Sequence, residues 1–288
     1  MFFIFGSPRS GTTFLKELLN LNSKIFIPHE TDFIIPIAFI IDRVKDEVIG
    51  KKIILEIIVS SERYQESLAG SLSKADIANL VNSSSYSLFS ILNKIYDELA
   101  LRKGVSIAGD KSPNDLNYLN VLFEHNLFSS DLKIIHIVRD VRDVILSLLD
   151  TGWLPLNTNE MSVASSWQFR NLALTNHIKN YPEKYLLIKY EDLISNPQFH
   201  LSDICRFLGV NYETSMLNYS LMGKDLKHYS HHKNLGLPPI SERCYAWKKI
   251  KTKNFDAITR AAYPGLKTFD YETKASSITD KFLSLIRR

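Results

Sequence analysis

A short apolar run that leads through a glycine loop into a helical pattern is the feature that most constrains this chain. Residues 1–5, Met-Phe-Phe-Ile-Phe, have the pattern of a buried strand, which Gly6 ends. From Thr12 onward, apolar residues recur at helical spacing, at Phe14, Leu15, Leu18 and Leu19. A strand, a glycine loop and a helix in this order direct several backbone N–H groups and the positive end of the helix dipole at one point. The start of the chain therefore predicts a phosphate-binding loop.

Three further short apolar runs follow, with helical patterns between them. The expected strands cover residues 1–5, 105–109, 132–138 and 185–190. The expected helices cover residues 85–101, 115–128, 162–180 and 197–208, and one more follows Arg139. Short strands that alternate with helices are typical of a parallel sheet covered on both faces. The sequence therefore predicts a P-loop-like, three-layer α/β/α fold with a central parallel sheet.

Length and composition indicate a single domain over residues 1–288, because 45% apolar and 23% charged residues are ordinary for one compact core. Residues 42–103 are expected to form a mainly helical lobe, less regular at residues 60–73, that carries no chemical motif. Residues 224–253 are polar and basic, and we interpret them as a long functional loop.

Charge, cysteine content and hydropathy exclude several classes of protein. A net charge of +4, from 35 basic and 31 acidic residues, is too small for a protein that coats nucleic acid. Cys205 and Cys244 lack the spacing of metal ligands. The longest apolar stretch, residues 33–41, is far shorter than the roughly 20 residues that span a bilayer. The glycine loop begins at residue 6 and leaves no room for a secretion signal, which favours a cytoplasmic location.

The glycine loop has the spacing G-x-x-x-x-G-T-T from Gly6 to Thr13. A loop that binds nucleoside triphosphates carries lysine after its second glycine, where the lysine reaches the terminal phosphates. Thr12 occupies that place here, which argues against a kinase or an ATPase, and Arg9 supplies a cation within the loop. A tight turn without a ligand is the alternative, and the strand before the loop and the helix after it weigh against that alternative.

Residues 6–15, Gly-Ser-Pro-Arg-Ser-Gly-Thr-Thr-Phe-Leu, resemble the 5′-phosphosulfate loop of the sulfotransferase superfamily. These enzymes take a sulfuryl group from 3′-phosphoadenosine-5′-phosphosulfate (PAPS) and release 3′,5′-adenosine bisphosphate (PAP). The resemblance implies that PAPS is the donor, that PAP is a product and that no metal is required. It assigns the 5′-phosphosulfate to five loop residues, Arg9, Ser10, Gly11, Thr12 and Thr13.

A second motif begins where the strand at residues 132–138 ends. Arg139 follows this strand and Ser147 lies eight residues later, a pair that could clamp a second phosphate by charge-assisted hydrogen bonds. The residues alone also allow Arg139 to pair with Asp143, and Ser147 to lie on a helix surface. Residues 137–144 and Ser147 resemble the 3′-phosphate motif of the same superfamily, which assigns the 3′-phosphate to Arg139 and Ser147.

Two later segments extend the resemblance. Residues 189–193, Lys-Tyr-Glu-Asp-Leu, are similar to a Tyr-Glu-Asp strand end and place Tyr190 near the adenine, with a core aromatic as the alternative. Residues 239–248 are similar to the final cofactor loop of the bacterial and tyrosylprotein branch of the superfamily. That similarity implies cofactor contacts from Ser241, Arg243 and Trp247, while Cys244 and Tyr245 depart from the commonest forms of the loop.

Sulfuryl transfer needs a base for the proton of the acceptor and cations for the charge that builds on the bridging oxygen. Glu30 resembles the catalytic glutamate of the tyrosylprotein branch and is the predicted base, with His29 as its competitor. Glu30 could instead be a first-turn acid of the helix through residues 33–41. Lys111 resembles a lysine that stabilises the transition state together with Arg9, and an ordinary surface turn is the alternative.

Other parts of the chain leave the function less defined. His228, His231 and His232 lack a carboxylate or cysteine partner, so we expect a solvated basic loop and no metal site. The expected acceptor is a hydroxyl or amine of a carbohydrate, lipid, peptide or small metabolite, and no nucleic-acid partner is expected. Residues 42–103 would shape the acceptor pocket. A small-molecule kinase, favoured by Asp110 as a Walker B-like acid, and an inactive nucleotide-binding module are the alternative functions.

Overall fold

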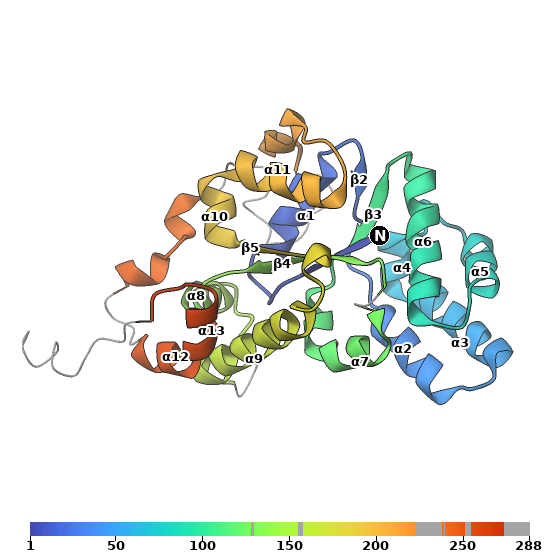
Figure 1. Ribbon diagram of the computed structural model, residues 1–288, viewed down its shortest axis with the longest axis horizontal. Helices are drawn as coiled ribbons and strands as arrows, with labels where there is room; N and C mark the ends of the chain where they lie inside the picture. Colours follow the sequence, from blue (N-terminus) through green and yellow to red (C-terminus); the bar gives the residue numbers. More distant parts are fainter. Residues whose placement is uncertain (128–129, 155–157, 223–237, 239, 251–254, 274–288) are drawn as a thin grey trace, which may run out of the picture.

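The computed structural model describes residues 1–127, 130–154, 158–222, 238, 240–250 and 255–273. Its centre is a five-stranded sheet in the order β2-β3-β1-β4-β5, in which all neighbouring strands are parallel (Figure 1). The strands are β1 (Phe2–Phe5), β2 (Ile25–Phe26), β3 (Ile107–Asp110), β4 (Lys133–Val138) and β5 (Tyr185–Lys189). The predicted α/β fold with a central parallel sheet is confirmed. The sequence analysis did not predict β2, because two residues give no periodic pattern.

β1 lies in the middle of the sheet, and its side chains alternate between two cores. Phe2 and Ile4 belong to the core that includes α1 (Thr12–Asn20), α10 (Tyr190–Ser195) and α11 (Pro197–Leu208). Phe3 and Phe5 face the opposite core, which includes the helices of residues 34–103 and α9 (Glu160–Ile178). Gly109 of β3 makes room for Phe2, since a β-carbon there would lie 2.5 Å from the phenyl ring. Burial on both faces explains why β1 is entirely apolar.

Five helices between residues 34 and 103 extend past the edge of the sheet that holds β2 and β3 (Figure 1). They are α2 (Ile34–Arg43), α3 (Glu47–Ser60), α4 (Glu62–Ser67), α5 (Lys74–Ser83) and α6 (Leu88–Lys103). Ser61, Ser73 and Ser87 accept N–H hydrogen bonds at the N-termini of α4, α5 and α6, so serine caps set three of the helix starts. The short helix α4 lies within the stretch that the sequence suggested to be irregular.

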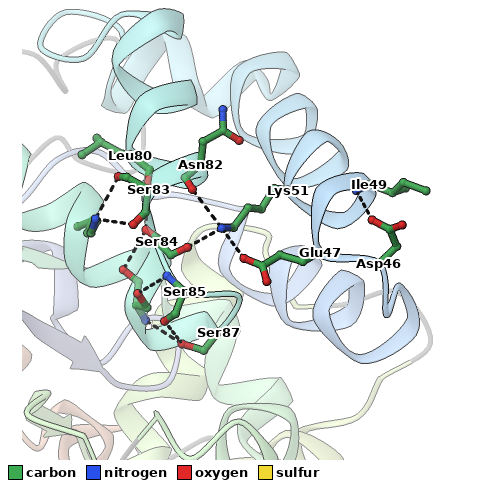
Figure 2. Close-up of polar contacts among 12 residues, drawn as sticks. Asp46, Glu47, Ile49, Lys51, Leu80, Asn82, Ser83, Ser84, Ser85 and Ser87 are labelled. Atoms are coloured by element: carbon green, nitrogen blue, oxygen red, sulfur yellow. Dashed lines mark hydrogen bonds and ion pairs between the residues drawn. The ribbon is translucent and has the colours of Figure 1, made fainter.

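A buried lysine joins α3 to the C-terminal end of α5 (Figure 2). The ammonium of Lys51 donates to the carbonyl oxygens of Asn82 at 3.1 Å and Ser84 at 2.5 Å, and it pairs with Glu47 at 2.6 Å. The last carbonyl groups of a helix have no partner within the helix. Lys51 therefore satisfies carbonyl groups at the end of α5 and fixes the packing of α3 against it.

The remaining helices lie on the same side of the sheet as α9 (Figure 1). They are α7 (Leu119–Glu124), α8 (Val141–Asp150), α12 (Asp256–Ala261) and α13 (Tyr263–Thr268). The 3₁₀ turns are η1 (Pro113–Tyr118), η3 (Pro182–Lys184), η4 (Thr214–Leu217), η5 (Tyr219–Leu221), η7 (Ser241–Arg243) and η8 (Ala246–Lys249). The helix expected over residues 115–128 is split, because η1 precedes α7. Within the described ranges, no helix combines the length and apolar character needed to cross a bilayer.

Candidate functional site

The loop between β1 and α1 passes through a confined space in left-handed conformations. Arg9 has φ 69° and Gly11 has φ 93°, and the amide of Ser10 donates to the carbonyl oxygen of Ser7 at 3.0 Å. A β-carbon at Gly11 would lie 2.4 Å from the ring of Tyr190, so the loop requires glycine there. A left-handed non-glycine residue such as Arg9 is uncommon and tends to occur at functional sites.

The N-terminus of α1 has the features of an anion site. Its cap residue is Gly11, which has no side chain to accept a hydrogen bond from the first N–H groups of the helix. The hydroxyl of Ser10 is buried, and among the described residues it has no hydrogen-bond partner. Buried polar groups normally have partners, so both observations fit a site that is completed by a ligand.

The two predicted phosphate motifs meet in the structure. The Nε group of Arg9 donates to the hydroxyl of Ser147 at 3.0 Å, although 138 positions separate them. Arg139 donates through Nη1 to the carbonyl oxygen of Arg9 at 3.1 Å and through Nη2 to that of Arg243 at 2.9 Å. Arg9, Arg139, Ser147 and the backbone of Arg243 therefore form one cluster. Ser147, half-buried on its helix, contacts Arg9, and the described part of the chain shows no Arg139–Asp143 salt bridge, although Arg139 opposes the rise that burial causes in the pKa of the Asp143 carboxyl.

The electrostatics of this cluster favour an anion. Burial lowers the pKa of Arg9, and the nearby guanidinium groups of Arg139 and Arg243 lower it further. Over the described ranges, neither Arg9 nor Arg139 forms a salt bridge with a carboxylate, and the buried Nε of Arg139 has no hydrogen-bond partner. The Asp150 carboxylate opposes the shift in the pKa of Arg9. Partly buried like charges that lack a salt bridge are costly, and a phosphate between them would reduce that cost.

Tyr190 connects the cluster to the glycine loop. Its ring lies against Gly11, and the guanidinium of Arg139 lies 4.6 Å from the ring centroid. The side chain also belongs to the core on the α1 face. The Tyr190 ring is therefore a core aromatic that also borders the loop, and its place near the adenine stays a prediction.

Trp247 anchors the segment that carries Arg243. Its indole N–H donates to Asp140 at 3.1 Å, its backbone N–H donates to Asp143 at 3.0 Å, and its ring stacks 3.6 Å from the guanidinium of Arg142. Asp140 and Arg142 form a fully buried ion pair. Trp247 therefore fastens residues 240–250 to the motif that begins at Arg139. The sequence analysis named Trp247 but missed Asp140 and Arg142, whose pairing depends on the fold.

Ser241 is placed apart from these contacts. Its side chain is exposed and donates to Glu242 at 3.2 Å. The predicted histidine group, His228, His231 and His232, falls outside the described residues. Within the ranges that are described, no three His, Cys, Asp or Glu side chains converge as metal ligands would.

Lys111 joins the phosphate loop to Glu30. Its ammonium is buried just after β3, donates to the Thr13 hydroxyl at 3.2 Å and forms a short ion pair with the Glu30 carboxylate. Burial lowers the pKa of Lys111, and the Glu30 carboxylate opposes this shift. Lys111 is therefore not part of an exposed surface turn. Glu30 is not a first-turn acid either, since α2 begins at Ile34 with Phe33 as its cap and has no acid in its first turn.

Further groups lie around this pair, and of these the sequence analysis named only Asp110, as a Walker B-like acid. Asp110 accepts hydrogen bonds from Thr31 and Tyr96. Burial, together with the carboxylates of Asp110 and Glu30, raises the pKa of Asp115 well above its ordinary value. Lys16, one turn beyond Thr12, is buried and pairs with Glu17 at 3.1 Å. No local sequence signal marks Asp115 or Lys16.

Comparison with known proteins is consistent with these motifs. Residues 2–214 match the family described as "Sulfotransferase family". Rat (Rattus norvegicus) sulfotransferase 2A1 is 28% identical over 138 residues, and rat sulfotransferase 2A2 is 27% identical over 162 residues. These matches cover 44% and 46% of this chain, and 46% and 54% of the rat proteins. The chain therefore spans about half the length of these curated relatives.

Two solved structures resemble the whole fold. The sulfotransferase domain from the curacin biosynthetic pathway has a TM-score of 0.63 at 20% identity and covers 95% of this chain and 98% of that domain. The sulfotransferase domain from the Synechococcus PCC 7002 olefin synthase has a TM-score of 0.61 at 22% identity and covers 94% of each chain. At these identities the likeness establishes the fold.

Proposed function

The chain belongs to the sulfotransferase family, and we propose that it transfers the sulfuryl group of PAPS to a hydroxyl or amine of an acceptor and releases PAP. The observation that carries this proposal is the position of Lys111. Its ammonium contacts Thr13 of the phosphate loop and Glu30 at the same time. A cation therefore contacts both the phosphate loop and a candidate base, which is the arrangement that sulfuryl transfer requires.

The two ends of the donor have separate binding groups in this proposal. The 5′-phosphosulfate would lie at the N-terminus of α1, where Arg9, Ser10, Gly11, Thr12 and Thr13 surround it. The unpartnered Ser10 hydroxyl and the uncapped helix N-terminus support this assignment. The 3′-phosphate would lie between Arg139, Ser147 and Arg243, which is supported by the unpartnered Nε of Arg139. Tyr190 would border the adenine, and Trp247 would hold Arg243 in place.

The reaction follows from this arrangement. The acceptor oxygen or nitrogen forms a bond to sulfur as the bond from sulfur to the bridging phosphate oxygen breaks. Glu30 takes the proton that the acceptor loses, and Lys111 and Arg9 stabilise the charge that builds on the bridging oxygen. The contact between Lys111 and Glu30 keeps the base next to the loop.

We propose a chemical class for the acceptor and no particular compound. It carries a hydroxyl or an amine, and residues 42–103 together with residues 240–250 would border its site. Ser241, whose hydroxyl contacts Glu242 in the structure, stays a proposed cofactor contact. A cytoplasmic location belongs to the same proposal.

Two measurements test the function. Transfer of ³⁵S from labelled PAPS should occur to at least one member of an acceptor panel that covers phenols, sugars, steroids, lipids and amines. Isothermal titration should show tighter binding of PAP than of ATP, with or without magnesium. A preference for magnesium-ATP would favour the kinase alternative. Binding of PAP without transfer to any acceptor would favour an inactive nucleotide-binding module.

A further inference from the structure

A buried network of hydroxyl groups around Asp110 surrounds the Glu30–Lys111 pair. The Oδ2 atom of Asp110 accepts hydrogen bonds from the Tyr96 hydroxyl at 2.5 Å and from the Thr31 hydroxyl at 2.8 Å. The Ser112 hydroxyl donates to the carbonyl oxygen of Thr31 at 2.9 Å. All four side chains are buried, with Tyr96 at 0% exposure and none above 5%. We call Tyr96, Thr31, Asp110 and Ser112 the Asp110 network.

The Asp110 network joins the sequence neighbours of Glu30 to those of Lys111. Thr31 directly follows Glu30, while Asp110 and Ser112 flank Lys111 on both sides. Two hydrogen bonds therefore tie the segment of Glu30 to the segment of Lys111. Asp110 accepts one of them from Thr31, and Ser112 donates the other to Thr31. These segments come from different parts of the chain, one after β2 and the other after β3.

Tyr96 brings a third element into the network. It lies on α6, and its ring packs edge-to-face on Phe3 of the central strand with centroids 6.2 Å apart. Through the hydroxyl of Tyr96, the helical lobe donates a hydrogen bond to Asp110. A buried carboxylate is costly unless hydrogen bonds satisfy it, and Asp110 obtains two of its donors from outside its own strand.

We propose that Tyr96 and Thr31 are positioning residues that hold Glu30 and Lys111 against each other through Asp110. This inference rests on the proposed function, because the pair it positions is the proposed base and its cation. Lys111 must reach both Thr13 and Glu30, and its backbone is fixed by neighbours that bond to Thr31. Loss of a hydroxyl from the network should shift the pair relative to the phosphate loop and leave the nucleotide contacts in place.

The first test compares two buried tyrosines. Tyr96→Phe removes only the hydroxyl that reaches Asp110. Tyr64→Phe removes an equally buried hydroxyl in the same lobe, which donates to the carbonyl oxygen of Leu72 at 2.8 Å. Tyr96→Phe should lower kcat for sulfuryl transfer about tenfold while the Kd for PAP stays within about twofold. Tyr64→Phe should leave kcat unchanged, and an equal kcat loss in both variants would overturn the proposal.

A double-mutant cycle separates positioning from general damage. In a Glu30→Gln background, Tyr96→Phe should cause no further loss of the residual kcat, because its effect passes through Glu30. Thr31→Val should behave in the same way. Additive losses would show that Tyr96 acts independently of the pair and would contradict the proposal.

A double-mutant cycle on stability tests the inference independently of the proposed function. If the wild-type chain were inactive with PAPS, the proposed function would be refuted, and the cycle would still measure the coupling. Tyr96→Phe and Lys111→Met are combined, and the unfolding equilibrium constants are measured by urea denaturation. The two changes should be coupled by about threefold or more, whereas Tyr64→Phe and Lys111→Met should be independent. Absence of coupling between Tyr96 and Lys111 would overturn the inference.

Discussion

Arg139 donates through its guanidinium to the backbone carbonyl oxygen of Arg9 at 3.1 Å. The first residue after β4 therefore holds the conformation of the loop after β1. Because β1 and β4 are adjacent and parallel, their carboxyl ends lie at the same edge of the sheet. The two phosphate motifs are thus brought together by sheet order and by one side-chain contact.

Arg139→Ala should weaken the binding of PAP about tenfold more than the binding of adenosine 5′-phosphosulfate, which lacks the 3′-phosphate. Some loss for both ligands is expected, because Arg139 also supports Arg9. Isothermal titration with the two ligands measures the difference. Arg206→Ala, on the exposed surface of α11, serves as the control and should change neither affinity. Equal losses for both ligands would contradict a 3′-phosphate role.

Glu30→Gln should lower the rate of labelled-sulfate transfer by about 10²–10⁴-fold and leave a small residual rate, while the Kd for PAP stays close to that of the wild type. The amide keeps the shape of the side chain but cannot accept the proton of the acceptor. His29→Asn is the matched variant at the neighbouring position and should retain transfer. If Glu30→Gln stays active and His29→Asn does not, the histidine is the base.

Gly11→Ala should cost both stability and PAP affinity. The added methyl group would meet the Tyr190 ring, and the left-handed φ of 93° is unfavourable for alanine. Gly104→Ala separates the two causes, because Gly104 also has a positive φ but open space around its α-carbon. Gly104→Ala should lower the free energy of unfolding by about 1 kcal/mol without effect on PAP binding. Equal behaviour of the two variants would show that the contact with Tyr190 is unimportant.

The sequence predicted features formed by neighbouring residues better than contacts between distant residues. The strand, loop and helix at residues 2–20 follow one another in the chain, so their pattern predicted the loop and its place in the fold. The contact between Arg9 and Ser147 joins distant residues, and the sequence did not predict it, because the resemblance assigned Arg9 to the 5′-phosphosulfate and Ser147 to the 3′-phosphate. The sequence could not show that Glu30 pairs with Lys111, although it named each of them.

The Asp110 network lay beyond sequence reasoning for a physical reason. A tyrosine within a helix such as α6 has the same pattern whether its hydroxyl meets a carboxylate, as at Tyr96, or a carbonyl group, as at Tyr64. The difference is created by packing between α6 and β3. Trp247 is similar, since its sequence motif suggested a nucleotide contact and its actual partners, Asp140 and Arg142, come from another segment.

Lys51→Met should destabilise the helical lobe by about 1–3 kcal/mol, because it leaves the buried carbonyl group of Ser84 without its ammonium partner and removes the part-buried contact with Asn82. Urea denaturation measures the loss in the free energy of unfolding. Lys52→Met changes the adjacent, exposed lysine and should have little effect. Similar losses in the two variants would show that the contacts drawn in Figure 2 contribute little.

Asp143 should make stability depend on pH. Burial raises the pKa of its carboxyl to about 6 from 3.8, so the folded chain holds this proton more tightly than the unfolded chain. The protonated form favours folding, and its contribution is complete below pH 4 and disappears as the pH rises through about 6. Asp143→Asn keeps an oxygen that can accept the hydrogen bond from the Trp247 backbone and removes the titration.

The stability of Asp143→Asn relative to the wild type should therefore increase between pH 4 and about pH 6 and stay constant above that. The change should be up to about 3 kcal/mol, the free-energy equivalent of the shift in pKa. Urea denaturation at a series of pH values gives this difference, and any cost of burying the amide adds the same offset at every pH. Asp131→Asn, at an exposed position, is the control and should give a curve parallel to that of the wild type. A parallel curve for Asp143→Asn would show that its carboxyl titrates alike in both states.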